Sequence, residues 1–207
     1  MGCVSTGQWM RPERAVAWFF DAGALSLDFG YTGALAGDAG AGEQLSSPAA
    51  LREWLAPRVA GALPDEPGER ELTDAVQLRD TLARLYVARA DDAAPDPDDI
   101  DTLNLFAAMP DIPPSLGGGR RQAGAGRIRL AQALSSIARD AVAILGDRSE
   151  VRVRRCAAED CRLVFHDESR TNNRRWCAME RCGNRAKVRA HRERAAMRRH
   201  QARESVS

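Results

Sequence analysis

Apolar and polar residues alternate over a short stretch near the start of the chain. Leu25, Leu27 and Phe29 occupy every second position, with polar residues between them. A period of two is typical of a strand with one buried face. The pattern therefore predicts a short strand over residues 25–29, closed by the glycines of residues 30–33.

Later segments have the 3.6-residue period of amphipathic helices instead. Ser47-Pro48 and Asp96-Pro97 each place an N-cap residue before a proline at the first helical position. We expect Gly146 to end the last of these helices in a left-handed conformation. The predicted helices cover residues 48–59, 69–90, 97–109 and 134–145.

Two further segments near the middle of the chain lack this period. Residues 110–126 are rich in proline and glycine, which predicts a loop. Residues 127–130 are predicted to form a short strand. At the other end, residues 1–14 show no period and are expected to be a flexible tail. The fold class that follows is α+β, with a mainly helical domain at residues 15–150 that contains a small strand pair.

Charge divides the chain into two parts. Residues 1–150 hold 14 arginines and 22 acidic residues, a balance of −8. Residues 151–207 hold 15 arginines, one lysine and 7 acidic residues, a balance of +9. Such an asymmetry is typical of a neutral or acidic domain joined to a basic module that binds a polyanion.

The sequence predicts neither a membrane protein nor an enzyme. The longest apolar runs fall far short of the roughly 20 residues that span a bilayer, and the start lacks the pattern of a secretory signal. We therefore expect a cytoplasmic protein with no membrane partner. Residues 1–150 contain no histidine and no recognised catalytic motif, so we expect no enzyme activity and no catalytic residues.

Four cysteines form two pairs with identical spacing. Cys156 and Cys161 enclose four residues, as do Cys177 and Cys182, and fifteen residues separate the pairs. Thiolates in two tight turns can supply the four ligands of a tetrahedral zinc site, and a closed site of this kind is structural. An iron–sulfur cluster and disulfides remain alternatives at this point. His166 lies outside both pairs and is expected to be a hairpin or surface residue.

Between the pairs, residues 163–165 and 174–176 flank a polar segment. This pattern predicts a hairpin whose Phe165 and Trp176 cover the metal. After the second pair, an alanine- and arginine-rich segment over residues 186–204 has strong helix propensity. The order of knuckle, hairpin and knuckle at a helix start predicts a treble-clef-like finger with a basic helix over residues 151–207.

Arginine side chains of this segment suit phosphate oxygens and guanine edges. The segment has no aromatic residue for stacking on unpaired bases, which favours duplex DNA over RNA. A merely solvated basic helix is the alternative. The candidate DNA-binding residues are Asn184, Arg185, Lys187, Arg189, Arg192, Arg174 and Arg175.

The cysteine segment resembles a known family. Its pattern of Cys156-x4-Cys161, Arg174-Arg175-Trp176-Cys177 and Cys182-Gly183-Asn184-Arg185 is similar to the CGNR zinc finger. The resemblance implies zinc as the cofactor. In that family the finger follows a domain called ABATE. Residues 25–32 resemble the opening strand of that domain, although Tyr31 stands where asparagine is expected. The combination of the two domains implies a stress-induced bacterial transcription regulator.

The leading hypothesis is a zinc-dependent, DNA-binding transcription regulator. Residues 15–150 would sense a small-molecule effector or form a homodimer, and residues 151–207 would bind duplex DNA. The main alternative is a small-molecule-binding protein or an enzyme whose zinc finger docks a protein or RNA.

Overall fold

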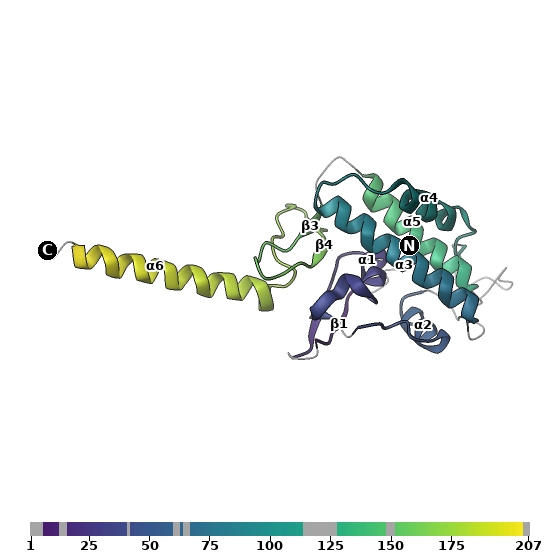
Figure 1. The fold of residues 1–207 in the computed structure, drawn as a ribbon, viewed down its shortest axis with the longest axis horizontal. Helices are drawn as coiled ribbons and strands as arrows, with labels where there is room; N and C mark the ends of the chain where they lie inside the picture. Colours follow the sequence, from purple (N-terminus) through teal and green to yellow (C-terminus); the bar gives the residue numbers. More distant parts are fainter. Residues whose placement is uncertain are drawn as a thin grey trace, which may run out of the picture.

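The computed structural model describes residues 6–12, 16–40, 42–59, 63, 67–113, 128–147 and 152–204. Within these ranges the chain is mostly helical and has two small antiparallel strand pairs. A body of packed helices is followed by a small finger, from which the last helix, α6 (Asn184–Glu204), projects away from all other elements (Figure 1). No helix in the described ranges is long and apolar enough to cross a membrane.

The body begins with a hairpin of strands β1 (Gln8–Met10) and β2 (Trp18–Phe20). They pair antiparallel, with Gln8 opposite Phe20. Met10 and Phe20 are fully buried in the core. The prediction of a flexible tail is therefore wrong for residues 8–10; three residues are too few for their alternation to stand out in the sequence. Residues 1–5 and 13–15 lie outside the described ranges.

The predicted strand over residues 25–29 is a helix, α1 (Leu25–Gly30). The polar residues of the alternating pattern do not face solvent. Ser26 is fully buried and donates a 2.6 Å hydrogen bond from its Oγ to Asp140. Asp28 is also buried and accepts a hydrogen bond from the backbone of Gly7. Because both faces of the segment are buried, its alternation carries no information about which face is solvated. A 3₁₀ segment, η1 (Ala34–Ala39), follows.

The helices with capped starts are confirmed. The Ser47 side chain accepts a hydrogen bond from the backbone of Ala50, and the Asp96 side chain accepts one from Asp98. Helix α1 packs on α3 and α5, and α4 packs on the same two helices. Their bounds are α2 (Pro48–Leu55), α3 (Glu69–Ala90), α4 (Pro97–Ala108) and α5 (Leu130–Gly146).

The ends of α5 differ from expectation. Gly146 is the last helical residue and does not have a positive φ; the chain leaves the helix through Asp147 in an extended conformation. The strand predicted over residues 127–130 is absent from its described part, because Leu130 already begins the helix and the Gln132 side chain accepts a hydrogen bond from the backbone of Arg129. Of the loop predicted at 110–126, residues 114–126 lie outside the described ranges.

The finger is built on strands β3 (Val153–Arg155) and β4 (Val164–His166). They pair antiparallel with Arg154 opposite Phe165, so β4 does not pair with residues 174–176 as predicted. Residues 156–161, which we call the first cysteine loop, form the turn of this hairpin. Segment 174–176 joins the other side of that loop, where the carbonyl of Arg175 accepts a 2.8 Å hydrogen bond from the Ala157 amide.

One buried core runs from the body into the finger. The Tyr31 hydroxyl donates to the Val164 carbonyl and accepts from the Val164 amide, each at 2.7 Å. The His166 amide donates to the carbonyl of Ala22 at 2.8 Å. At Gly23, whose φ is +80°, a β-carbon would lie 2.3 Å from the His166 carbonyl oxygen. Strand β4 is therefore held directly against the backbone of the body.

Candidate metal centre

The first cysteine pair is positioned by the turn between β3 and β4. The Cys156 amide donates to the Leu163 carbonyl at 2.8 Å, which closes the hairpin. The Cys161 amide donates to the Ala158 carbonyl at 3.0 Å, which folds the loop back on itself. Both thiols consequently lie on the same side of the hairpin end.

The second pair lies at the start of α6. Cys182 belongs to a π-helical turn, η2 (Met179–Gly183), in which the amides of Cys182 and Gly183 both donate to the Ala178 carbonyl at 3.1 Å. The Cys177 amide donates to the Cys156 sulfur at 3.4 Å and joins the two pairs. The turn ends at the residue before α6, so the position of Cys182 sets where the basic helix begins.

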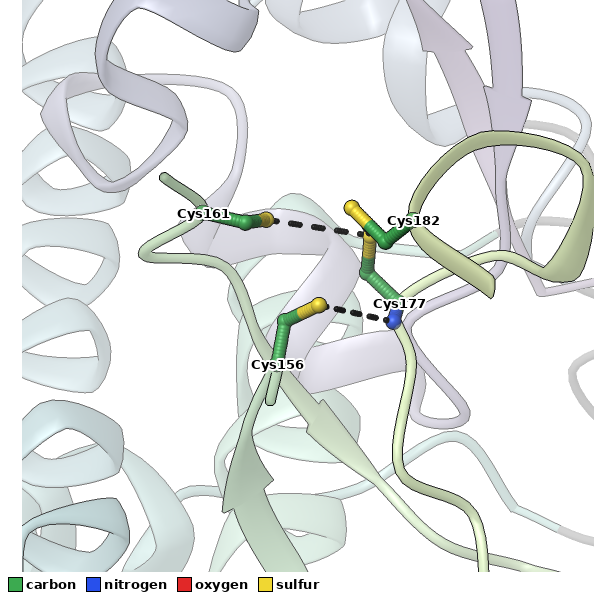
Figure 2. A group of neighbouring side chains, drawn as sticks. All are labelled: Cys156, Cys161, Cys177 and Cys182. Carbon is green, nitrogen blue, oxygen red and sulfur yellow. Dashed lines mark hydrogen bonds between the residues drawn. The ribbon is translucent and has the colours of Figure 1, made fainter. Parts of the chain in front are cut away.

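The four thiols converge on one point (Figure 2). Their sulfur atoms all lie within 4.8 Å of one another; Cys161 and Cys177 are 3.8 Å apart, and Cys177 and Cys182 are 3.5 Å apart. Zinc–sulfur bonds of about 2.3 Å in a tetrahedron place sulfurs about 3.8 Å apart. Cys156, Cys177 and Cys182 are buried. The cluster fits zinc, with all four predicted ligands in place.

The thiols also interact electrostatically. Hydrogen bonds from Cys161 and Cys177 hold the pKa of Cys156 far below its usual range. The same contact with Cys156 raises the pKa of Cys161 to about 12 and raises that of Cys177 further. Without a cation, crowding therefore favours a thiolate at Cys156 beside neutral thiols at Cys161 and Cys177. A divalent ion stabilises all four as thiolates, so metal binding releases protons and weakens as pH falls.

The alternatives weighed from the sequence fit less well. The four described cysteines are free thiols, and their sulfur separations exceed the roughly 2.05 Å of a disulfide bond. Separations this short suit a single tetrahedral ion better than a cluster of several irons. His166 lies in β4 with its Nδ1 3.1 Å from the Gly23 carbonyl oxygen, outside the cysteine cluster, as expected for a hairpin residue.

The two aromatic residues expected to cover the metal lie in different surroundings from each other. Trp176 lines a cavity beside Cys182 and the start of α6. Phe165 is fully buried and packs against the Arg174 guanidinium, 4.4 Å from the ring centre. Arg174 also donates to the carbonyls of Cys177 and Asp21, at 2.6 and 2.8 Å. This predicted DNA-binding residue is therefore engaged in joining the finger to the body, while Arg175 lies 5.2 Å from the Trp176 ring centre.

Two of the predicted DNA-binding residues on α6 are ion-paired with the first cysteine loop. Arg185 contacts Asp160 at 2.6 Å and the Cys182 sulfur at 3.2 Å. The hydrogen bond to Cys182 raises the pKa of Arg185 further. Arg189 contacts Glu159 at 2.9 Å. Sequence reasoning missed the two acidic partners, although their place inside the first C-x4-C loop was a usable signal.

The remaining predicted residues of α6, Asn184, Lys187 and Arg192, are exposed and make no side-chain hydrogen bond or ion pair within the described ranges. A residue not singled out as a site is Asp167, which is fully buried. It accepts hydrogen bonds from the amides of Ser169 and Arg174, at 2.9 and 2.7 Å. Although burial opposes ionisation, these bonds lower the pKa of Asp167. Asp167 thus orders the segment that leads to the second pair.

The fold and the centre together define a class: a helical body joined to a zinc finger that carries a basic helix. The family model for the CGNR zinc finger matches residues 152–195. A second model, ABATE, described as "Putative stress-induced transcription regulator", matches residues 23–148. The chain belongs to the ABATE family and carries a CGNR zinc finger at its C-terminal side. Neither description is that of an enzyme. A search of curated proteins found no match to the chain.

Proposed function

We propose that this protein is a transcription regulator that binds duplex DNA through α6 and requires zinc to do so. The observation that carries the proposal is the placement of α6. The helix begins two residues after the cysteine ligand Cys182 and extends away from the body as a strongly basic rod (Figure 1). At 1.5 Å per residue its 21 residues are about 32 Å long.

Cys182 connects the metal centre to the helix that is proposed to bind DNA. Its π-helical turn joins the metal centre to α6, and Arg185 contacts the Cys182 sulfur. The side chains of residues 186–199 have few apolar partners, since α6 packs mainly on η2. A helix with so little tertiary support depends on its fixed first turns. Loss of zinc would therefore leave α6 without a fixed orientation relative to the finger.

Duplex DNA is the favoured partner because α6 has no aromatic side chain on which unpaired bases could stack. Its cations instead suit rows of phosphates. The treble-clef comparison, the division at residue 150 and a cytoplasmic location stay predictions that accompany this proposal.

The test is fluorescence anisotropy of the full chain with a mixed-sequence duplex over a salt series. Binding should weaken steeply as salt rises and should be lost when a chelator removes zinc. Matched titrations with single-stranded DNA, RNA and heparin serve as controls. Equal affinity for heparin would indicate a nonspecific polyanion binder. Absence of binding at low salt would favour the alternative, a finger that docks a protein.

The effector part of the proposal is supported by a cavity of about 540 Å³ between α3, α4 and α5. Its volume lies within the usual range for small-molecule sites. Leu85, Leu103 and Leu145 supply apolar lining, and Arg89 and Asn104 supply polar groups. A thermal-shift screen of small apolar carboxylates, with Leu103→Trp as the variant that fills the cavity, tests it. A shift that persists in the variant would place the ligand elsewhere.

A homodimer is the other proposed role of the body. Leu105 on α4 is 71% exposed, and both Ile100 on the same helix and Met109, the residue after its end, are exposed as well. Analytical ultracentrifugation of the wild type against Leu105→Ser would test whether this surface joins two copies. A monomer at all concentrations would remove the dimer from the proposal.

A further inference from the structure

Helix α6 has one side that faces the first cysteine loop. Arg185 and Arg189 are paired there with Asp160 and Glu159, at 2.6 and 2.9 Å. A cavity of about 140 Å³ separates the helix from the loop. We call this side of α6 the loop face, and the helix residues that line the cavity define it: Arg185, Ala186, Arg189, Ala190 and Glu193.

The rest of the helix circumference carries five further cations whose side chains the structure describes. At about 100° per residue, positions 187, 194 and 198 form one row and positions 192 and 199 form a second. All five side chains are exposed, and none makes a hydrogen bond or ion pair with any part of the chain that the structure describes. We call this side the outer face. Its residues are Lys187, Val188, His191, Arg192, Arg194, Ala195, Arg198 and Arg199.

The two cationic rows flank a narrow strip of other residues. Val188, His191 and Ala195 follow one another along this strip, and Val188 is 49% exposed. A helix about 10–12 Å across fits the major groove of B-DNA, which is about 12 Å wide. Phosphates then lie on both sides of the helix, and the strip faces the base edges. Small apolar side chains there tolerate close approach and can contact thymine methyl groups.

We infer that the outer face of α6 contacts the duplex, whereas Arg185 and Arg189 fix the helix to the finger and do not contact DNA. This inference rests on the proposed function and assigns its contact surface. Because only His191 offers hydrogen-bonding atoms in the strip, phosphate contacts dominate affinity and base discrimination is modest. It also divides the arginines that the sequence alone groups together by their i, i+4, i+7 spacing. Arg192 projects about 20° around the helix from Arg185, but it lacks an acidic partner among the described residues and forms the edge of the outer face.

The matched test removes two cations from each face of the full-length zinc protein. One variant is Lys187→Ala with Arg194→Ala. The other is Arg185→Ala with Arg189→Ala, combined with Glu159→Gln and Asp160→Asn so that no acid is left unpaired. Anisotropy with one duplex over a salt series gives the slope of log affinity against log salt. Each phosphate contact contributes about 0.9 to this slope.

The outer-face variant should reduce the slope by about 1.8, and the loop-face variant should leave it unchanged. A smaller slope in the loop-face variant, or equal losses in both, overturns the assignment. If the wild type itself does not bind, the proposed function fails and the question of faces does not arise. Equal binding of single strands overturns the choice of duplex DNA.

Arg185 contacts a ligand cysteine, so its replacement could disturb the centre. Zinc content and far-ultraviolet circular dichroism of each variant detect this. A second pair avoids it: Arg189→Gln, with Glu159→Gln, against Arg192→Gln. These positions lie three residues apart on one helix, one paired and one unpaired. Only Arg192→Gln should lower the salt slope, by about 0.9; a loss confined to Arg189→Gln contradicts the inference.

Discussion

Helices α5 and α6 are similar in length, with 17 and 21 residues, but they are held in place differently. Helix α5 buries an apolar stripe that includes Leu134, Ile137 and Ala141 between α1, α3 and α4. Within the described ranges, helix α6 is held mainly at its start, by the cysteine centre and two ion pairs. The apolar burial that orders the body is thus replaced in α6 by metal coordination, which leaves the side chains of its outer face exposed.

The largest expected effect is the loss of the metal. Cys177→Ser removes the most central ligand, whose sulfur contacts those of Cys161 and Cys182. Structural zinc contributes on the order of 10 kcal/mol to the folding of small fingers, so the finger and the start of α6 should unfold. Zinc content by atomic absorption should fall, and helix content should drop. Cys3→Ser is the control and should change neither; zinc retained at one equivalent by Cys177→Ser would contradict the ligand set.

Shortening a buried side chain of α5 should create a cavity that destabilises the body and leaves the metal centre intact. Ile137 is fully buried, and Ile137→Ala should lower the free energy of unfolding by about 2–5 kcal/mol. Urea denaturation followed by circular dichroism measures this loss. Zinc content should stay at the wild-type level. The partly exposed Val142 serves as control, since Val142→Ala should have a much smaller effect; similar losses at both positions would contradict the packing described for α5.

Tyr31 is one of the residues that join the two regions. Tyr31→Phe leaves both the amide and the carbonyl of Val164 without their partner, and an unsatisfied buried polar group costs about 1–3 kcal/mol. We expect the unfolding of the finger and of the body to separate into two calorimetric transitions, or a single transition to shift down. The exposed Trp9→Phe is a control for aromatic substitution. An unchanged calorimetric trace would show that the hydroxyl does not couple the two regions.

The smallest effect concerns the pH dependence of the body. Burial raises the pKa of Asp28 to about 7. The folded protein therefore binds this proton more tightly than the unfolded chain, and the stability that the neutral carboxyl contributes is lost as pH rises from about 4 through 7. Asp28→Asn should abolish this loss, so its stability relative to wild type should increase by about 1–3 kcal/mol between pH 5 and pH 8. Urea denaturation at both pH values checks the sign; a parallel pH dependence in the two proteins would contradict it.

Some features could be predicted because their physical cause is local. Caps at Ser47 and Asp96 mark helix starts by contacts within three residues, and the symmetric cysteine spacing specifies the ligand set. The family resemblance added zinc and the two-part architecture, and the matched models confirm it.

Other features depend on contacts between distant residues. The helical state of residues 25–30 depends on burial against Tyr86 and Asp140, which no short window contains. The pairing of β4 with β3 depends on the first cysteine loop acting as a turn. The division of α6 into two faces depends on Glu159 and Asp160, whose acidic side chains lie 30 and 25 residues before their arginine partners.

The two hydrogen bonds between Tyr31 and Val164 have a consequence for building chimaeric proteins from members of this family. The two family matches meet between residues 148 and 152, which invites exchange of fingers at that joint. A transplanted finger would nevertheless present its own strand to Tyr31, Ala22 and Gly23 of a foreign host. The transferable unit is therefore the finger together with the segment from residue 18 to residue 31, two pieces that are far apart in the gene and inseparable in the folded chain.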